Sequence, residues 1–147
     1  MTQVNRSKGV TLLGWLFIVK SLMAIVGLFT LKNRLAAYEA AHFNLPDTYY
    51  YVVQSFTSLN MVLSLVAGIG LLRTLSWGRI LAVSLTVLSF LYEVGFHFVY
   101  IHRYTVPYFI SSGKPVFVLY ISLFLGLLWT AFICYYFNRP GVKGQFQ

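Results

Sequence analysis

Four long apolar segments, separated by shorter polar stretches, make up most of the chain. They cover residues 10–31, 50–72, 79–102 and 116–137. The hydrocarbon core of a bilayer is about 30 Å thick, and about 20 helical residues can span it. The first segment is also longer than the apolar core of a signal peptide, which has about 7–15 residues. The pattern predicts an all-α fold, in which residues 1–147 form one domain built as a membrane bundle of four transmembrane helices.

The connections between these segments differ in character. Residues 29–43 contain neither Gly nor Pro and are rich in Ala, which favours helix. We therefore expect the first helix either to run on past the bilayer or to bend into an interfacial helix before Pro46. The turn RTLSWGR, residues 73–79, is short, so the second and third helices should form a tight antiparallel hairpin. Gly68 and Gly70 suit close helix contact.

Composition agrees with a membrane location. The chain is 59% hydrophobic and 10% charged, whereas an ordinary soluble domain is about 25% charged. Eleven Lys and Arg against three Asp and Glu give a net charge of +8. The basic residues lie mostly at the ends of apolar segments rather than in one patch, so the expected partner is the lipid bilayer and not nucleic acid. A single cysteine, Cys134, excludes an internal disulfide.

The distribution of Lys and Arg predicts the orientation. One side of the membrane would carry six of them: Arg6, Lys8, Arg73, Arg79, Arg139 and Lys143. The other side would carry four: Lys32, Arg34, Arg103 and Lys114. Because basic loops stay in the cytoplasm, both termini are expected to be cytoplasmic. We expect a multi-pass protein of a bacterial inner (cell) membrane.

Three polar residues interrupt the spans at one depth. Lys20, Asn60 and Glu93 each lie about 14–16 Å below the outer end of their segment, at about 1.5 Å per helical residue. A lone charge near the midplane costs several kcal/mol. We therefore predict a Lys20–Glu93 pair with Asn60 as a third partner. Ala24 and Gly27 share the face of Lys20 and would let a neighbouring helix approach.

The stretch LSFLYEVGFHF, residues 88–98, leaves the role of this network open. Glu93 and His97 are four residues apart, so they share one helix face, and His titrates near neutral pH. They could form part of a proton or cation path. Alternatively, the network has a structural role and fixes the register of the helices. A third alternative is that Lys20 extends to the cytoplasmic side and Glu93 is protonated.

Other candidate chemistry is sparse. Glu39 and His42 have the i, i+3 spacing of carboxylate metal sites in helical bundles, but that motif is normally doubled and here it occurs once. A solvated helix is the favoured interpretation, and neither metal nor cofactor is expected. The sequence contains no Walker motif, no H-E-x-x-H and no recognisable nucleophile–base set.

Three stretches resemble a known group of proteins. They are KGVTLLGWLFIVKSL, GLLRTLSWGRILAVSLTVLSFL and YYFNRPGVKGQF. They are similar to the GVT start, the W-(A/G)-R inner turn and the RP-x-V-K tail of a widespread group of small, uncharacterised four-helix bacterial integral membrane proteins. The resemblance implies four helices with cytoplasmic tails. It implies no activity and no catalytic residues.

The expected function is therefore that of an integral membrane protein without catalysis of its own. It would act as an accessory subunit or interaction module, with other membrane subunits or a second copy as partners. The alternative is a small oligomeric transporter or proton/cation channel that uses Glu93 and His97. An enzyme acting on lipid or quinone ranks third.

Overall fold

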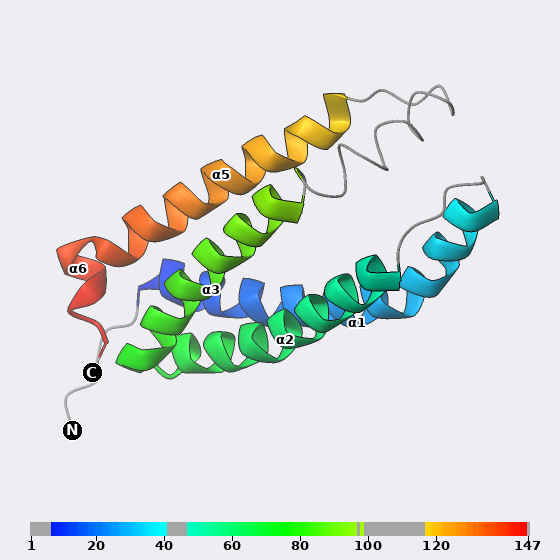
Figure 1. The fold of residues 1–147 in the computed structure, drawn as a ribbon. Coiled ribbons are helices and arrows are strands. Elements are labelled where there is room, and N and C mark those ends of the chain that lie inside the picture. The colour runs from blue at the N-terminus through cyan, green and yellow to red at the C-terminus, as the bar shows by residue number, and fades with distance from the viewer. Residues whose placement is uncertain (1–6, 41–46, 97, 99–116, 147) are drawn as a thin grey trace.

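The computed structural model describes residues 7–40, 47–96, 98 and 117–146, and all regular structure in these ranges is helical (Figure 1). The helices are α1 (Lys8–Ala40), α2 (Asp47–Leu72), α3 (Ser76–Phe96), α5 (Phe117–Asn138) and the short α6 (Pro140–Lys143). Four stretches are long and apolar enough to cross a membrane: Lys8–Thr30, Tyr50–Leu72, Ser76–Phe96 and Tyr120–Asn138. The predicted all-α bundle of four membrane-spanning helices is confirmed.

The first helix is longer than its apolar segment. α1 continues without interruption from Lys8 to Ala40, beyond residue 31, so it runs on rather than bending into a separate helix. Its alanines and the lack of Gly and Pro after Gly27 explain this continuation. α3 is described as far as Phe96, and its predicted end at residue 102 lies outside the described residues.

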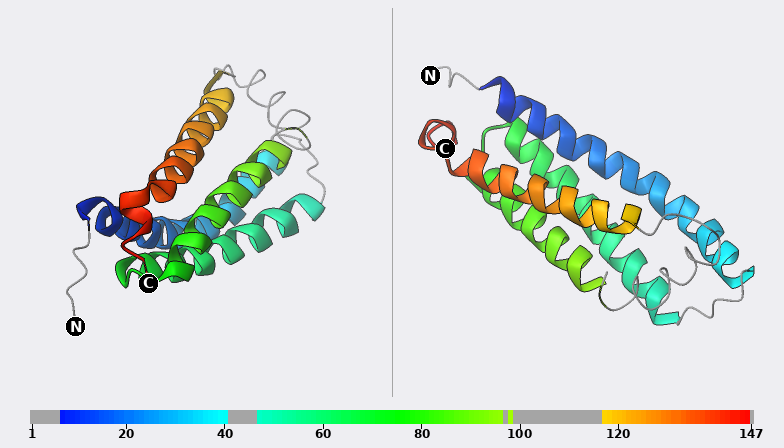
Figure 2. Two further views of the ribbon diagram at one scale, coloured as in Figure 1. Left: turned by 90° about the vertical axis from the view of Figure 1, so that its left-hand side faces the viewer. Right: turned by 90° about the horizontal axis from the view of Figure 1, so that it is seen from above.

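The helices are packed tightly at one end and spread at the other. Consecutive helices pack against one another, and the α1–α2 interface is the largest. Away from the end that carries the chain termini, α3 and α5 diverge from α1 and α2 (Figures 1 and 2). The buried apolar core comprises Val10, Leu13, Phe17, Ala67, Leu71, Ala82, Leu85, Ile133, Phe137 and Val142. These residues come from the parts of the helices nearest the termini.

Glycines permit the close approach at this end. A Cβ placed on Gly70 would lie 2.7 Å from the Cα of Gly78, across the α2–α3 hairpin. A Cβ on Gly68 would lie 2.8 Å from the carbonyl oxygen of Gly14 in α1. The predicted close contacts of Gly68 and Gly70 are therefore confirmed. The hairpin turns through Thr74, which has a positive φ of 55°.

The carboxyl tail folds back onto the same end. The Phe146 ring packs edge-on against Phe137, with 6.0 Å between ring centroids. The backbone N–H of Ser7 donates to Oε1 of Gln145 at 2.9 Å. Ser7 also caps α1, because its Oγ accepts a hydrogen bond from the N–H of Val10 at 3.3 Å. A hydrogen bond thus joins Ser7, near the start of the chain, to Gln145, near its end.

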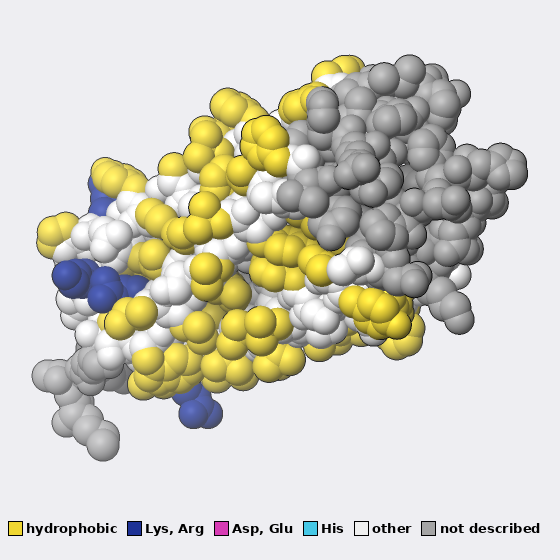
Figure 3. All heavy atoms as spheres, viewed as in Figure 1, with side chains coloured by type: hydrophobic (Ala, Val, Ile, Leu, Met, Phe, Trp, Pro, Cys, Tyr) yellow, Lys and Arg dark blue, Asp and Glu magenta, His cyan; other side chains and the backbone are white. Residues whose placement is uncertain are grey.

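The outer surface suits contact with lipid. Hydrophobic side chains cover much of the face shown in Figure 3, and the visible Lys and Arg side chains lie toward the end with the termini. Large apolar residues such as Phe29, Leu88 and Phe124 are exposed. In a membrane such side chains face acyl chains, so their exposure carries no penalty.

The hairpin glycines generate a stability prediction. Replacing Gly78 with Ala should destabilise the protein by about 1–3 kcal/mol, because the added methyl group collides with the backbone of Gly70. Gly95→Ala in the same helix is the matched control, since no described atom lies within 4 Å of its added Cβ. The control should be neutral or stabilising by up to about 1 kcal/mol. Reversible unfolding in mixed micelles, followed by circular dichroism, measures both, and equal stability of the two variants contradicts the close crossing.

Candidate functional site

The spread part of the bundle contains a largely apolar pocket with several polar side chains in its lining. It has a volume of about 370 Å³ and lies between α1, α2 and α3. Its lining residues are Lys20, Ala24, Phe56, Thr57, Asn60, Ser89, Tyr92, Glu93 and Phe96. The structure therefore brings Lys20, Asn60 and Glu93, which the sequence places at one depth on three different helices, around a single cavity.

Asn60 connects α2 with α3. Its Nδ2 donates to Oγ of Ser89 at 2.5 Å, and its Oδ1 accepts a hydrogen bond from Oγ of Ser64 at 3.1 Å. Ser64 is fully buried and lies one turn further along α2. Because Asn60 both donates and accepts within the bundle, its amide is matched in a region where hydrocarbon offers no partner. This part of the network joins two helices through a side-chain hydrogen bond.

A second hydrogen bond connects α1 with α2 at nearly the same level. The buried hydroxyl of Ser21 donates to the carbonyl oxygen of Met61 at 2.8 Å. Ser21 is the residue after Lys20, and Met61 is the residue after Asn60. The polar positions on α1 and α2 are therefore held at matching heights.

Glu93 faces α5 as well as the pocket. Its carboxylate accepts a hydrogen bond from the side chain of Ser122. Its Oε2 also lies against Gly126, where an added Cβ would come within 3.0 Å of that oxygen. Neither α5 residue was predicted from the sequence. Their spacing, with Thr130 four residues further on, forms a stripe of small residues in an otherwise bulky helix, and this stripe is the signal that could have identified them.

Lys20 reaches the pocket from α1. Its ammonium group lies within Coulombic range of the Glu93 carboxylate, and its Nζ is 6.0 Å from the centroid of the Phe17 ring. The Lys20 side chain is nevertheless exposed. Direct contact between the two charges stays a prediction. The expectation that Gly27, on the face of Lys20, lets a neighbouring helix approach is not met among the described residues, since none of their atoms lies within 4 Å of a Cβ built there.

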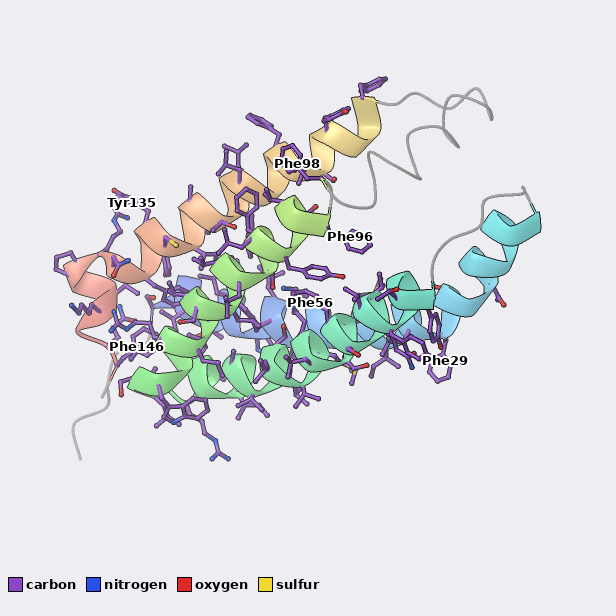
Figure 4. All side chains as sticks on the ribbon, viewed as in Figure 1. Phe29, Phe56, Phe96, Phe98, Tyr135 and Phe146 are labelled. Atoms are coloured by element: carbon purple, nitrogen blue, oxygen red, sulfur yellow. The ribbon has the colours of Figure 1, made fainter. Side chains whose placement is uncertain are left out.

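Aromatic rings form one wall of the pocket. Phe56 stacks on Tyr92 with 3.5 Å between centroids and 7° between ring planes, and Tyr92 stacks on Phe96 at 5.4 Å. Phe56 and Phe96 project into the space between α2 and α3 (Figure 4). The cavity thus presents an ammonium, a carboxylate and an amide beside an apolar aromatic surface. Such a lining is typical of sites that bind a ligand or a partner side chain.

Two of the predicted features fall outside this description. His97 and His42 lie outside the described residues, and Glu39 is placed only as part of α1. The Glu93–His97 pair and the Glu39–His42 metal site therefore stay predictions. Within the described ranges, no three residues of His, Cys, Asp or Glu gather as a metal site would require.

Comparison of the chain with protein-family models, with curated proteins and with solved structures finds no match. The resemblance of the three sequence stretches to small four-helix bacterial membrane proteins stays a prediction.

The charges around the pocket lead to a test by substitution. Glu93→Gln should destabilise the protein by up to about 3 kcal/mol, because it leaves Lys20 without a counter-charge inside the membrane. Adding Lys20→Met to that variant should restore part of the lost stability. Unfolding in mixed micelles measures the three proteins.

Lys8→Met, which removes a charge at the exposed start of α1, serves as the control and should change little. A double variant less stable than Glu93→Gln alone refutes the pairing of Lys20 with Glu93.

Proposed function

We propose that this protein is a non-catalytic multi-pass protein of a bacterial cytoplasmic membrane, with both termini in the cytoplasm. It acts as an accessory subunit or an interaction module for other membrane proteins or for a second copy of itself. The excess of Lys and Arg at the end with the termini supports this orientation. The polar groups of the spans support a non-catalytic role, because Ser89 and Ser64 bond to the amide of Asn60 rather than to a base.

The exposure of Lys20 carries the proposal of a partner. Lys20 lies in the middle of the span Lys8–Thr30 and is exposed at the rim of the pocket. An ammonium group at this depth costs several kcal/mol wherever lipid rather than protein surrounds it. A partner helix that covers the pocket would remove this cost and would supply an acceptor to the remaining N–H groups of Lys20. The neighbouring α1 residues Val19 and Met23 are exposed and apolar, as a helix interface in a membrane requires.

The mass of the intact assembly tests this function. Native mass spectrometry from a mild detergent should give a complex of fixed stoichiometry, with a second copy or with another subunit. Lys20→Met should release the partner, because it removes the donor at the centre of the contact. Lys8→Met, at the exposed end of α1, should leave the complex intact. A monomeric unmodified protein, or a complex that persists in Lys20→Met, refutes the proposal.

A second candidate function is proton or cation transport, and the size of the pocket favours it. A cavity of about 370 Å³ beside Glu93 has room for several waters, each of which occupies about 30 Å³ in the liquid. Water beside a carboxylate inside a membrane is a common element of proton relays. His97, one helical turn beyond Glu93 in the sequence, would extend the path toward the outer side.

Proton flux into liposomes that hold the purified protein tests this candidate. Transport predicts flux in the unmodified protein and its loss in Glu93→Gln, with helicity and oligomer size unchanged. Gln54→Glu at an exposed position of α2 serves as a control for an altered carboxylate count and should retain the flux. Absence of flux in the unmodified protein eliminates transport and leaves Glu93 as a structural partner of Lys20.

A further inference from the structure

A second polar cavity lies near the ends of α3 and α5, away from the Lys20–Glu93 pocket. It has a volume of about 140 Å³ and is lined by Arg79, Ile80, Val83, Ser84 and Asn138. A neighbouring cavity of about 530 Å³ also involves Asn138, together with Cys134, Tyr135, Arg139 and Pro140. Asn138 therefore stands between a cavity lined by Arg79 and a cavity lined by Arg139.

Arg79 is half-buried, and some of its N–H groups have no hydrogen-bond acceptor among the described residues. Its Nη1 donates to the carbonyl oxygen of Phe137 at 3.2 Å, and its guanidinium carbon lies 6.0 Å from the centroid of the Phe146 ring. Its Nε is buried and has no hydrogen-bond partner among the described residues. Buried donors of native proteins are almost always matched by protein, water or an ion, so this one indicates a further ligand.

The acidic residues belong to parts of the helices far from Arg79. The three acidic residues are Glu39, Asp47 and Glu93. Glu93 lies fourteen residues further along α3, which corresponds to about 21 Å at about 1.5 Å per residue. Glu39 and Asp47 belong to the ends of α1 and α2 that are farthest from the α2–α3 turn. Among the described residues, no acidic side chain therefore competes with an external anion for Arg79.

We propose that this cavity binds the headgroup phosphate of an anionic phospholipid. Arg79 would bind the phosphate, and Ser84 and Asn138 would donate to its oxygens, while Arg139 lines the neighbouring cavity. One N–H of the Asn138 amide already donates to the carbonyl of Cys134 at 2.8 Å, which leaves the second N–H for the lipid. Guanidinium groups match phosphate oxygens through paired hydrogen bonds.

The position along the spans selects a lipid rather than a soluble anion. The span Ser76–Phe96 begins three residues before Arg79, and the span Tyr120–Asn138 ends at Asn138. Both ends are at the level of the membrane interface, where anionic headgroups lie. Ile80 and Val83 also line the cavity, and they would contact an acyl chain. The site depends on the membrane location of the protein and is independent of the proposed partner and transport functions.

Lipid titration of the purified protein tests the site. Binding of phosphatidylglycerol is measured by native mass spectrometry of the protein in detergent, with phosphatidylcholine of the same acyl chains and inorganic phosphate in parallel. Arg79→Gln should bind phosphatidylglycerol about tenfold more weakly than the unmodified protein, as expected for the loss of a charged hydrogen-bonding group. Arg73→Gln is the matched control, because it removes an equal charge from an exposed position in the adjacent turn. It should keep the affinity.

A second variant decides the outcome if Arg79→Gln does not fold. Ser84→Leu fills the cavity but keeps both arginines, and it should lower the affinity for phosphatidylglycerol to a similar extent. Ser55→Leu, at an exposed position of α2, is its control. Equal binding by the cavity variants and their controls, or equal binding of phosphatidylcholine, overturns the proposal. If inorganic phosphate binds as tightly as phosphatidylglycerol, the site belongs to a free anion, and the lipid assignment is overturned.

Discussion

Hydrocarbon supplies no hydrogen-bond partners, so the polar groups of a membrane-spanning bundle have to find their partners within the protein. This constraint accounts for the long uninterrupted helices, which satisfy the backbone internally. It also accounts for several hydroxyl groups of the spans. Thr86 donates to the carbonyl of Ala82 and Thr130 to that of Gly126, each within its own helix. Asn60 and Ser21 instead bond to neighbouring helices, and these contacts bring the spans together at one level.

Small residues pack the helices at one end of the bundle, and polar residues connect them further along. Toward the end with the termini, Gly70 and Gly78 let two backbones touch, and Phe137 fills the centre as a fully buried ring. Further along, the helices diverge (Figures 1 and 2) and the contacts become hydrogen bonds around the pocket. Dispersion contacts between close backbones stabilise the first part. The second part keeps a cavity because charged and amide groups occupy positions that a packed core would fill with apolar side chains.

The sequence predicted the properties that depend on distance along a helix. The four spans, the hairpin glycines and the common depth of Lys20, Asn60 and Glu93 all follow from residue number and a fixed rise per residue. It did not predict properties that depend on helix rotation and crossing angle. Ser122 and Gly126 were missed because large apolar residues surround them on α5 and conceal the face they form. Gly27 was expected in a helix contact, but no described atom lies within 4 Å of a Cβ built there.

The distribution of charge connects the two cavities. The three acids of the chain are Glu39, Asp47 and Glu93, and Glu93 is the acid that lies within Coulombic range of Lys20. Glu93 is about 21 Å from Arg79 along α3, at about 1.5 Å per residue, and therefore cannot neutralise it. An isolated cation that is partly withdrawn from water is costly unless an anion reaches it. Lys20 has an acid of the same chain within Coulombic range, and the proposed partner would supply further acceptors to its ammonium group. Arg79 has no acidic side chain beside it among the described residues, and an anionic lipid is the proposed source of its counter-charge.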